Sequence, residues 1–137
     1  MTLLEYLNKN DIWAAEGGMA LTEISEGSAT ARMTVQRRHL NGAGTCQGGA
    51  LFTLADLAVA AVMNSHGNIT VGLENSITFH RPAFEGDELR AVATETVNHK
   101  KIPFCRVDIY NGKGELVASG NSMGYRKADS FDYSSLM

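Results

Sequence analysis

Apolar and polar residues alternate along this chain with two different periods, and the changes of period mark the expected elements. Residues 2–10 (TLLEYLNKN) follow a helical period and predict a short amphipathic helix, which the Gly17–Gly18 pair then interrupts. From Met19 the apolar positions recur every second residue. This alternation predicts two strands joined by a hairpin turn at Glu26–Gly27.

The longest apolar run lies between two loops that contain glycine. After the loop at residues 41–44, the run predicts one helix over about residues 47–65, and Gly67 suits a left-handed cap at its end. The remaining pattern is that of strands, with turns at residues 85–87 and 111–114. Strands are expected near residues 69–79, 88–98, 103–111 and 115–126.

Two strands, one apolar helix and four more strands predict an α+β fold. A helix of about 18 residues is about 27 Å long, enough to cover one face of a sheet of about six antiparallel strands. Because the helix is apolar on nearly every side, either the sheet curls around it or a second subunit covers the rest. We expect a single domain over residues 1–137, with a core at about 10–126 and a frayed or partner-bound tail at 127–137.

Composition and charge narrow the class of protein. Apolar residues make up 44% and charged residues 20% of the chain, as is ordinary for a globular protein. The 12 Lys and Arg residues stand against 15 Asp and Glu and form no basic block, which argues against a nucleic-acid partner. No secretory signal is visible, so we expect a cytoplasmic location, with Cys46 and Cys105 as free thiols.

Neither a membrane span nor a metal or cofactor site is expected. The apolar run at residues 48–63 is shorter than the about 20 residues that a spanning helix needs, and Asp56 lies near its midpoint. No dinucleotide-binding or P-loop glycine pattern is present. Histidines without the spacing of metal ligands occur at four positions: His39, His66, His80 and His99.

Asp56 is the most unusual residue of the sequence. It is the only acidic or basic side chain between His39 and His66, and it lies in the middle of the apolar helix, where we expect it to be buried. A buried carboxylate is expected to have hydrogen-bond or ionic partners, or a functional role, because an unpaired buried charge destabilises the fold. Two interpretations stay open: a structural carboxylate that is capped or bridged by water, or a carboxylate that burial tunes to act as a base or a nucleophile.

The start of the same helix is a second candidate site. The free backbone N–H groups at Gln47, Gly48 and Gly49 carry a partial positive charge that can bind a carbonyl oxygen or an oxyanion. The alternative is a tight junction between loop and helix. Asn41 can hydrogen-bond the same ligand, although an asparagine in a loop more often stabilises the turn itself.

The spacing of these groups constrains how they can act together. Gly48 and Asp56 are eight residues apart, which is about 12 Å along a helix axis. One reacting carbonyl group cannot contact both within a single chain. If both act on it, they come from different subunits, and the site lies at a dimer interface.

Two other candidates are weaker. Residues 120–124 (GNSMG) match the G-x-S-x-G pattern, but no histidine follows and no strand-turn-helix context is expected. Cys46 lies beside the proposed site without an evident base, so we interpret it as a packing or pocket-lining thiol.

Two segments of the chain carry a family resemblance. Residues 41–67 read NGAGTCQGGALFTLADLAVAAVMNSHG, and residues 77–89 read ITFHRPAFEGDEL. With the strand pattern that follows, the chain resembles the PaaI-type (phenylacetate-pathway) hotdog thioesterases over roughly residues 10–126. The resemblance implies a long helix wrapped by an antiparallel sheet, assembly into a dimer or a dimer of dimers, and hydrolysis of acyl-CoA thioesters without a cofactor.

The resemblance also implies roles for individual residues. The Gly48 N–H group would polarise the thioester carbonyl, Asn41 would help to hold substrate or water, and Asp56 of the other subunit would act as general base or nucleophile. Further substrate contacts would come from six residues: Gln47, Gly49, Arg81, Pro82, Lys100 and Lys101. For the two lysines, a solvated charge pair is an equal alternative.

Gln47 departs from the family pattern, which usually has histidine at this position. Glutamine can donate and accept hydrogen bonds like a neutral imidazole, but it does not titrate near neutral pH. Two other functions therefore stay open. The chain could bind acyl-CoA as a sensor or carrier without turnover, or it could be a hotdog hydratase or dehydratase, although no histidine has an evident place beside Asp56.

Overall fold

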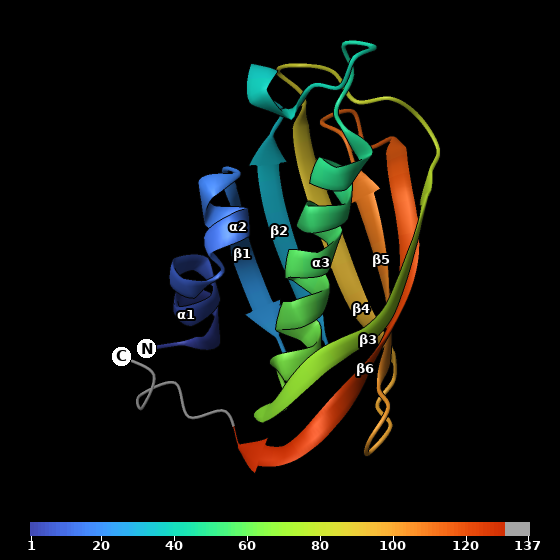
Figure 1. Cartoon of the computed structure of the whole chain (residues 1–137). Helices are drawn as coiled ribbons and strands as arrows, with labels where there is room; N and C mark the ends of the chain where they lie inside the picture. The colour runs from blue at the N-terminus through green and yellow to red at the C-terminus, as the bar shows by residue number, and fades with distance from the viewer. Residues whose placement is uncertain (131–137) are drawn as a thin grey trace.

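The computed structural model describes residues 1–130, and residues 131–137 of the predicted tail lie outside the described residues (Figure 1). The chain forms helices, one 3₁₀ turn at residues 37–39, and strands. The helices are α1 (Leu3–Asn10), α2 (Ile12–Glu16) and α3 (Gly48–Asn64). The strands are β1 (Met19–Ser25), β2 (Ser28–Thr34), β3 (Asn68–Phe79), β4 (Glu88–Val97), β5 (Phe104–Tyr110) and β6 (Leu116–Ser130).

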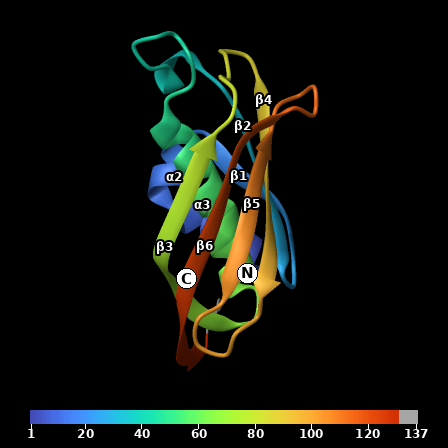
Figure 2. The same cartoon turned by 90° about the vertical axis from the view of Figure 1, so that its right-hand side faces the viewer.

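The strands form one antiparallel sheet that curls around α3 (Figure 1, Figure 2). Their order is β1-β2-β4-β5-β6-β3, so β1 and β3 are the two edges. The short helices α1 and α2 contact β1 and α3. The predicted α+β fold, with one long helix wrapped by an antiparallel sheet of about six strands, is confirmed.

Capping residues define both ends of α3. Gln47 has extended backbone angles (φ −61°, ψ 134°), and its side-chain oxygen accepts a hydrogen bond from Gly49 N–H. Leucine and alanine, both strong helix formers, fill eight of the 17 positions that follow. At the far end, Ser65 N–H donates to the Val62 carbonyl oxygen, and Gly67 turns the chain at φ +91°. The predicted helix and its glycine-assisted end are confirmed.

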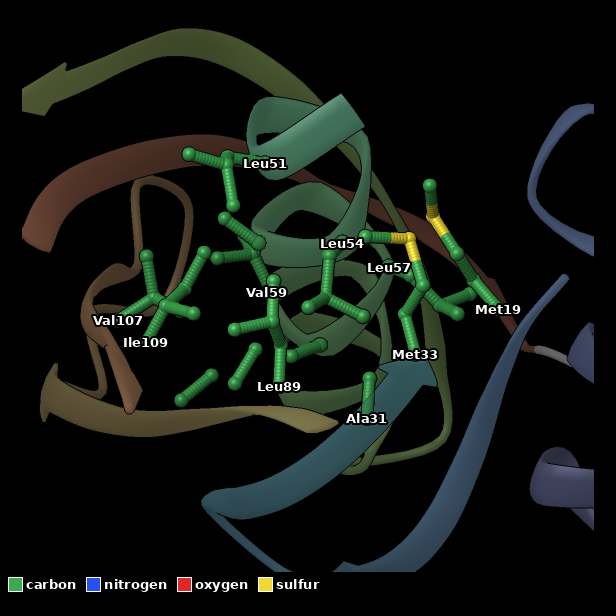
Figure 3. Packing of buried hydrophobic residues seen from close by; sticks show 14 of the residues in the cluster. Met19, Ala31, Met33, Leu51, Leu54, Leu57, Val59, Leu89, Val107 and Ile109 are labelled. Carbon is green, nitrogen blue, oxygen red and sulfur yellow. The ribbon is translucent and has the colours of Figure 1, made fainter. Parts of the chain in front are cut away.

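The hydrophobic core lies between α3 and the inner face of the sheet. Figure 3 shows Leu54 and Leu57 of α3 in one cluster with Met33 of β2, Leu89 of β4 and Ile109 of β5. Every second residue of these strands faces the helix, as the period of a strand requires. Burying each such side chain stabilises the fold by about 1.5–3 kcal/mol, so contact with the helix holds the sheet in its curled shape.

One stripe of α3 is left uncovered by the sheet. Gly49, Phe52 and Asp56 are exposed, and Thr53 and Ala60 are partly exposed. These positions are three or four residues apart and therefore lie on one face of the helix. The curled sheet thus accounts for most of the burial that the apolar helix requires, and the stripe is the part that it leaves open.

β3 is a long edge strand with apolar side chains at its surface. It pairs with β6 on one side, and no other described strand pairs with its second side. Val71, Leu73 and Phe79 are 43%, 53% and 51% exposed. A bulge at residues 72–74 interrupts the simple alternation expected over residues 69–79. An unpaired edge strand of 12 residues that exposes apolar side chains is a surface on which another strand can pair.

The structure differs from the sequence predictions at both ends of the fold. α2 is not predicted by the sequence pattern, because five residues are too few to show a helical period. Asp11 starts it by accepting a hydrogen bond from Ala14 N–H. At the other end, the tail was expected from residue 127, whereas β6 continues to Ser130 because that residue pairs with Asn68 at the start of β3.

No helix among residues 1–130 is long and apolar enough to cross a bilayer. The most apolar helix, α3, has 17 residues and carries Asp56. The apolar run at residues 48–63 is therefore a helix packed inside the protein, as its length and its charge predict.

Gly120 allows β6 to approach β3 closely, and we expect Gly120→Ala to destabilise the protein. A Cβ atom at this position would lie 2.3 Å from the Ser76 carbonyl oxygen, so the paired strands would have to separate. Overpacking of this kind lowers the free energy of unfolding by about 1–3 kcal/mol. Urea denaturation of Gly120→Ala and wild type measures this difference. The matched control is Gly112→Ala, which meets nothing within 4 Å and should change stability by less than about 0.5 kcal/mol.

Candidate active site

The loop before α3 is held in place by backbone hydrogen bonds. Cys46 N–H donates to the Ala83 carbonyl oxygen at 2.8 Å, and Gln47 N–H donates to the His39 carbonyl oxygen at 2.7 Å. His39 is itself buried, and its Nδ1 atom accepts a hydrogen bond from the backbone N–H of residue 36. The position of the helix start is therefore set by segments on either side of it rather than by the loop alone.

Gly48 presents a free backbone N–H group at this helix start. The neighbouring Gly49 N–H is taken by the side-chain oxygen of Gln47. Gly48 N–H donates to no acceptor among residues 1–130. A free N–H at the first turn carries part of the positive charge of the helix dipole, so this group can bind a carbonyl oxygen or an oxyanion.

A cavity of about 430 Å³ opens beside Gly48. Four residues predicted for the site, Asn41, Gly48, Arg81 and Pro82, line it together. They come from the loop before α3, from its first turn and from the segment after β3. Phe79 forms part of the wall so close to the helix that a Cβ atom at Gly48 would lie 2.9 Å from its ring. A larger residue at position 48 would therefore displace this aromatic side chain.

The Asn41 side chain is engaged within its own loop. Its Oδ1 atom accepts hydrogen bonds from Ala43 N–H at 2.9 Å and Thr45 N–H at 3.1 Å, and its Nδ2 atom donates to Thr45 Oγ1 at 3.1 Å. This is the turn-stabilising arrangement that the sequence analysis gave as the alternative. Asn41 lines the cavity while it holds the loop that shapes it.

The predicted basic residues are not all brought together. Arg81 pairs with Glu115 and donates from Nε to the Leu116 carbonyl oxygen at 3.2 Å. Lys100 and Lys101 lie in the loop after β4, whereas Arg81 lies near the start of that strand, which is about 33 Å long at 3.3 Å per residue. Within one chain the two lysines are therefore remote from the Gly48 cavity.

Asp56 lies on the exposed stripe of α3, so its expected burial in the core is wrong for the single chain. The helical period places residues 49, 52 and 56 on the side away from the sheet. The carboxylate is not free, because Asn75 Nδ2 donates to Asp56 Oδ1 at 2.8 Å. After the bulge at residues 72–74, β3 turns the Asn75 side chain toward the helix. This partner lies 19 residues away and is not predicted by the sequence analysis.

The surroundings of Asp56 raise the pKa of its carboxyl group. Desolvation by nearby protein atoms is the largest cause, the negative charge of Asp11 adds to it, and the hydrogen bond from Asn75 opposes both. A raised pKa makes an ionised carboxylate a stronger base. Asp56 thus has the chemistry of a general base, with one oxygen held by Asn75.

Gly48 and Asp56 occupy separate places in the structure. Gly48 lines the cavity described above, whereas Asp56 lines a small cavity of about 10 Å³ with Asn75 and Phe52. Both residues belong to the rigid helix α3, which holds them about 12 Å apart along its axis. Within one chain they do not face a common substrate atom.

Two further side chains belong to these cavities and were missed by sequence reasoning. Asn75 is one polar residue in a strand pattern that gave no hint of its contact with Asp56. His80 lines the cavity beside Gly48, with its Nε2 atom 2.7 Å from Ser119 Oγ. Its place directly before Arg81 and Pro82 in the sequence was the available signal, since those two residues were predicted for the site.

Other candidate chemistry is not supported. Burial raises the pKa of Cys46 to about 11, so the thiol is protonated at neutral pH and behaves as the pocket-lining group that the sequence predicts. Residues 120–124 lie within β6, without the strand-turn-helix setting of a nucleophile elbow. Among residues 1–130, no group of three or more His, Cys, Asp or Glu side chains could hold a metal ion.

A family model described as the Thioesterase superfamily matches residues 43–118, from the loop before α3 into β6. The matched segment is more than half of the chain and contains Gly48, Asp56 and Asn75. The chain belongs to the thioesterase superfamily. The cavity beside Gly48 and the stripe that carries Asp56 are therefore features of a thioesterase-superfamily domain.

Individual relatives of this thioesterase-superfamily chain support the assignment. Acyl-coenzyme A thioesterase PaaI of Escherichia coli is 36% identical over 118 residues, which cover 86% of this chain and 84% of that protein. Human acyl-coenzyme A thioesterase 13 is 30% identical over 107 residues, covering 76% of each chain. The solved structure of E. coli PaaI covers 96% of this chain and 100% of its own, with a TM-score of 0.88 and 32% identity. The resemblance to PaaI-type thioesterases and the hotdog fold are confirmed.

We expect Gln47→Ala to destabilise this thioesterase-superfamily chain by about 0.5–2 kcal/mol, the usual cost of losing an N-cap. The alanine leaves Gly49 N–H without the side-chain oxygen that now accepts its hydrogen bond. The matched control is Gln47→Glu, which keeps an acceptor oxygen and places a negative charge at the positive end of the helix. Thermal unfolding should show a lower melting temperature for the alanine variant than for wild type, and no decrease for the glutamate variant. Equal melting temperatures for all three proteins would contradict the capping role.

Proposed function

We propose that this protein hydrolyses acyl-CoA thioesters to the free acid and CoA. The observation that carries the proposal is that one helix presents both a free N–H group at Gly48 and a carboxylate of raised pKa at Asp56. The E. coli and human relatives, named acyl-coenzyme A thioesterases, indicate the substrate class. A thiol-release assay with a panel of short, long, branched and aromatic acyl-CoAs tests the proposal directly.

In this mechanism Gly48 N–H binds the oxygen of the thioester carbonyl. The helix dipole adds to the polarisation, and the charge on the oxygen grows as the tetrahedral intermediate forms. Gln47 acts indirectly, because its side chain caps Gly49 and leaves Gly48 as the free donor. Because capping requires only a side-chain acceptor, glutamine can occupy the position where the family usually has histidine.

Asp56 acts as the general base. Its carboxylate takes a proton from the attacking water, and its raised pKa favours that transfer. Asn41 would contact the substrate near the reacting carbonyl, and Gly49 would contact it at the start of the helix. Arg81 and Pro82 would contact the CoA portion. Lys100 and Lys101 would contact the CoA portion from the other subunit, since they are remote from Arg81 within one chain.

Catalysis by both groups requires a second copy of the chain. The helix holds Gly48 and Asp56 too far apart to act on one carbonyl, so each site takes Gly48 from one subunit and Asp56 from the other. The unpaired edge of β3, with Val71 and Leu73 exposed, and the open stripe of α3 support a homodimer. A dimer of dimers is compatible with the same arrangement.

A specific observation supports a second candidate, a hotdog hydratase or dehydratase. Such enzymes generally use a carboxylate with a histidine, and His80 lines the cavity beside Gly48. In a dimer this histidine would approach Asp56 of the other subunit. Turnover without CoA release would favour this candidate, whereas stoichiometric CoA binding without turnover would favour a sensor or carrier.

We expect Asp56→Asn to lower the rate of thioester hydrolysis by about 10²–10⁴-fold, the contribution of a positioned general base. Asparagine keeps an oxygen that accepts the Asn75 hydrogen bond, so acyl-CoA binding should change far less than the rate. The rate per folded molecule and the affinity, measured on one purified protein, provide the check. A rate within a few-fold of wild type in a well-folded variant would remove Asp56 from the mechanism.

The same variant has a predictable dependence of stability on pH. Because the pKa of Asp56 is raised in the folded state, its stabilising contribution is present below the ordinary pKa of aspartate. It is lost as the pH rises through the raised pKa. Asparagine does not ionise and therefore does not lose stability in this way. The melting temperature of Asp56→Asn relative to wild type should therefore increase as the pH rises from 3 to 7. A difference that does not vary with pH would contradict the raised pKa.

Subunit mixing tests the shared site. Asp56→Asn and Gly48→Val should each be nearly inactive alone. After exchange of subunits in an equal mixture, half of the dimers are mixed and each has one intact site, so about a quarter of the wild-type rate should return. Light scattering before mixing must give at least twice the 14.8 kDa chain mass. Proven exchange without recovered activity would show that the site is built within one chain.

A further inference from the structure

Asn75 holds one side of the Asp56 carboxylate. Its Nδ2 atom donates to Asp56 Oδ1 at 2.8 Å. An ionised carboxylate only accepts hydrogen bonds, so the amide turns its nitrogen toward Asp56 and its oxygen away. The contact therefore orients the carboxylate and, at the same time, sets the direction of the Asn75 oxygen.

That oxygen is a buried acceptor in need of a donor. Asn75 Oδ1 is inaccessible to solvent and accepts no hydrogen bond from residues 1–130. Buried polar atoms in folded proteins are almost always hydrogen-bonded, either to the protein or to ordered water. Since no described donor reaches Asn75 Oδ1, its acceptor capacity is left for an ordered water or for a group of a second subunit.

The space beside Asn75 fits one water molecule. The cavity between Asp56 and Asn75 has a volume of about 10 Å³, about the minimum that holds one water. Ser122 also lines it, is buried, and lies opposite Asn75 in the pairing of β3 with β6. Four polar residues, including Ser76, therefore line the space among apolar ones. A buried water usually makes about three hydrogen bonds, so the polar groups are enough to hold one.

We propose that Asn75 is a positioning residue that holds the hydrolytic water between its Oδ1 atom and the Asp56 carboxylate. The proposal rests on the thioester hydrolysis proposed above. The water donates one hydrogen to Asp56 and the other to Asn75, which leaves an oxygen lone pair free to attack the thioester carbonyl carbon. The first proton passes to Asp56 as the carbon–oxygen bond forms. The carbon–sulfur bond then breaks, and the CoA thiolate takes that proton, so that acid and thiol are the products.

Asn75 also keeps Asp56 ionised. Its hydrogen bond lowers the pKa of Asp56, against desolvation and the charge of Asp11 at the start of α2. The other titratable group coupled to Asp56 is Cys105 of β5, whose thiol pKa is raised to about 12 and which is therefore neutral. Loss of Asn75 should move the acidic limb of the pH profile of kcat to higher pH. A purely structural role would leave that limb in place.

The test replaces Asn75 by an apolar residue of nearly the same shape. In Asn75→Leu we expect kcat for acyl-CoA hydrolysis to fall by about 10²-fold, the scale of a misplaced reactant, with KM changed by only a few-fold. Asn75→Ser can still donate and accept, and should recover part of kcat. The matched control is Asn68→Leu, the same substitution at the start of β3 and remote from Asp56, which should leave kcat and its pH profile unchanged.

A high-resolution crystal structure of the full chain provides the second readout. Water density within hydrogen-bonding distance of both Asn75 Oδ1 and the Asp56 carboxylate is expected, and a site without that water would overturn the proposal. So would a wild-type kcat and pH profile in Asn75→Leu while Asp56→Asn is inactive, a result that leaves the proposed function intact. Full turnover in Asp56→Asn would instead overturn the proposed function. If Asn75→Leu does not fold, the kcat of Asn75→Ser and the crystal structure test the proposed role of Asn75 instead.

Discussion

The rest of this structure depends on the burial of one apolar helix. α3 is too apolar to lie on the surface, and the sheet curls until its inner face covers Leu54, Leu57 and their neighbours. Curling has a geometric limit, because a sheet wrapped around a helix leaves one side of it open. The stripe that carries Phe52 and Asp56 is that side. The same packing that stabilises the fold therefore leaves the carboxylate where a ligand or a second subunit can reach it.

The rigidity of α3 then divides the site in two. The start of the helix supplies a free N–H group at Gly48, and its middle supplies the Asp56 carboxylate, about 12 Å further along the axis. No side-chain rearrangement can shorten that distance. If both groups act on one thioester, a second copy of the chain has to supply one of them. The unpaired apolar edge of β3 gives such a copy a place to add its own strand.

Several polar residues near these groups serve the shape of the site. Asn41 holds the loop before α3, Gln47 caps the helix, and Arg81 pairs with Glu115 beside the cavity. Each contact fixes a wall or a donor that the proposed chemistry uses. Asn75 belongs to the same group, since it orients Asp56 and opposes the rise of its pKa. The site is thus built mainly from hydrogen bonds that position other groups.

Local sequence pattern was sufficient for most of the fold. The switch from a period of two to an apolar run and back predicts the hairpin, α3 and the four later strands, because local periodicity reflects which face of each element is buried. The motifs around Gly48 and Asp56 were sufficient for the family. Short elements escaped this approach: α2 has five residues, and the end of β6 is set by pairing with Asn68 on a strand far back in the chain.

Only the tertiary structure decided what surrounds each candidate residue. The sequence placed Asp56 in an apolar helix and therefore in the core, whereas the curl of the sheet leaves its side of the helix open. The bulge at residues 72–74 turns Asn75 toward the carboxylate. The pairing of β4 with β5 carries Lys100 away from Arg81. These outcomes depend on how elements distant in the sequence pack and pair, and a pattern read along one segment contains no information about its partners in space.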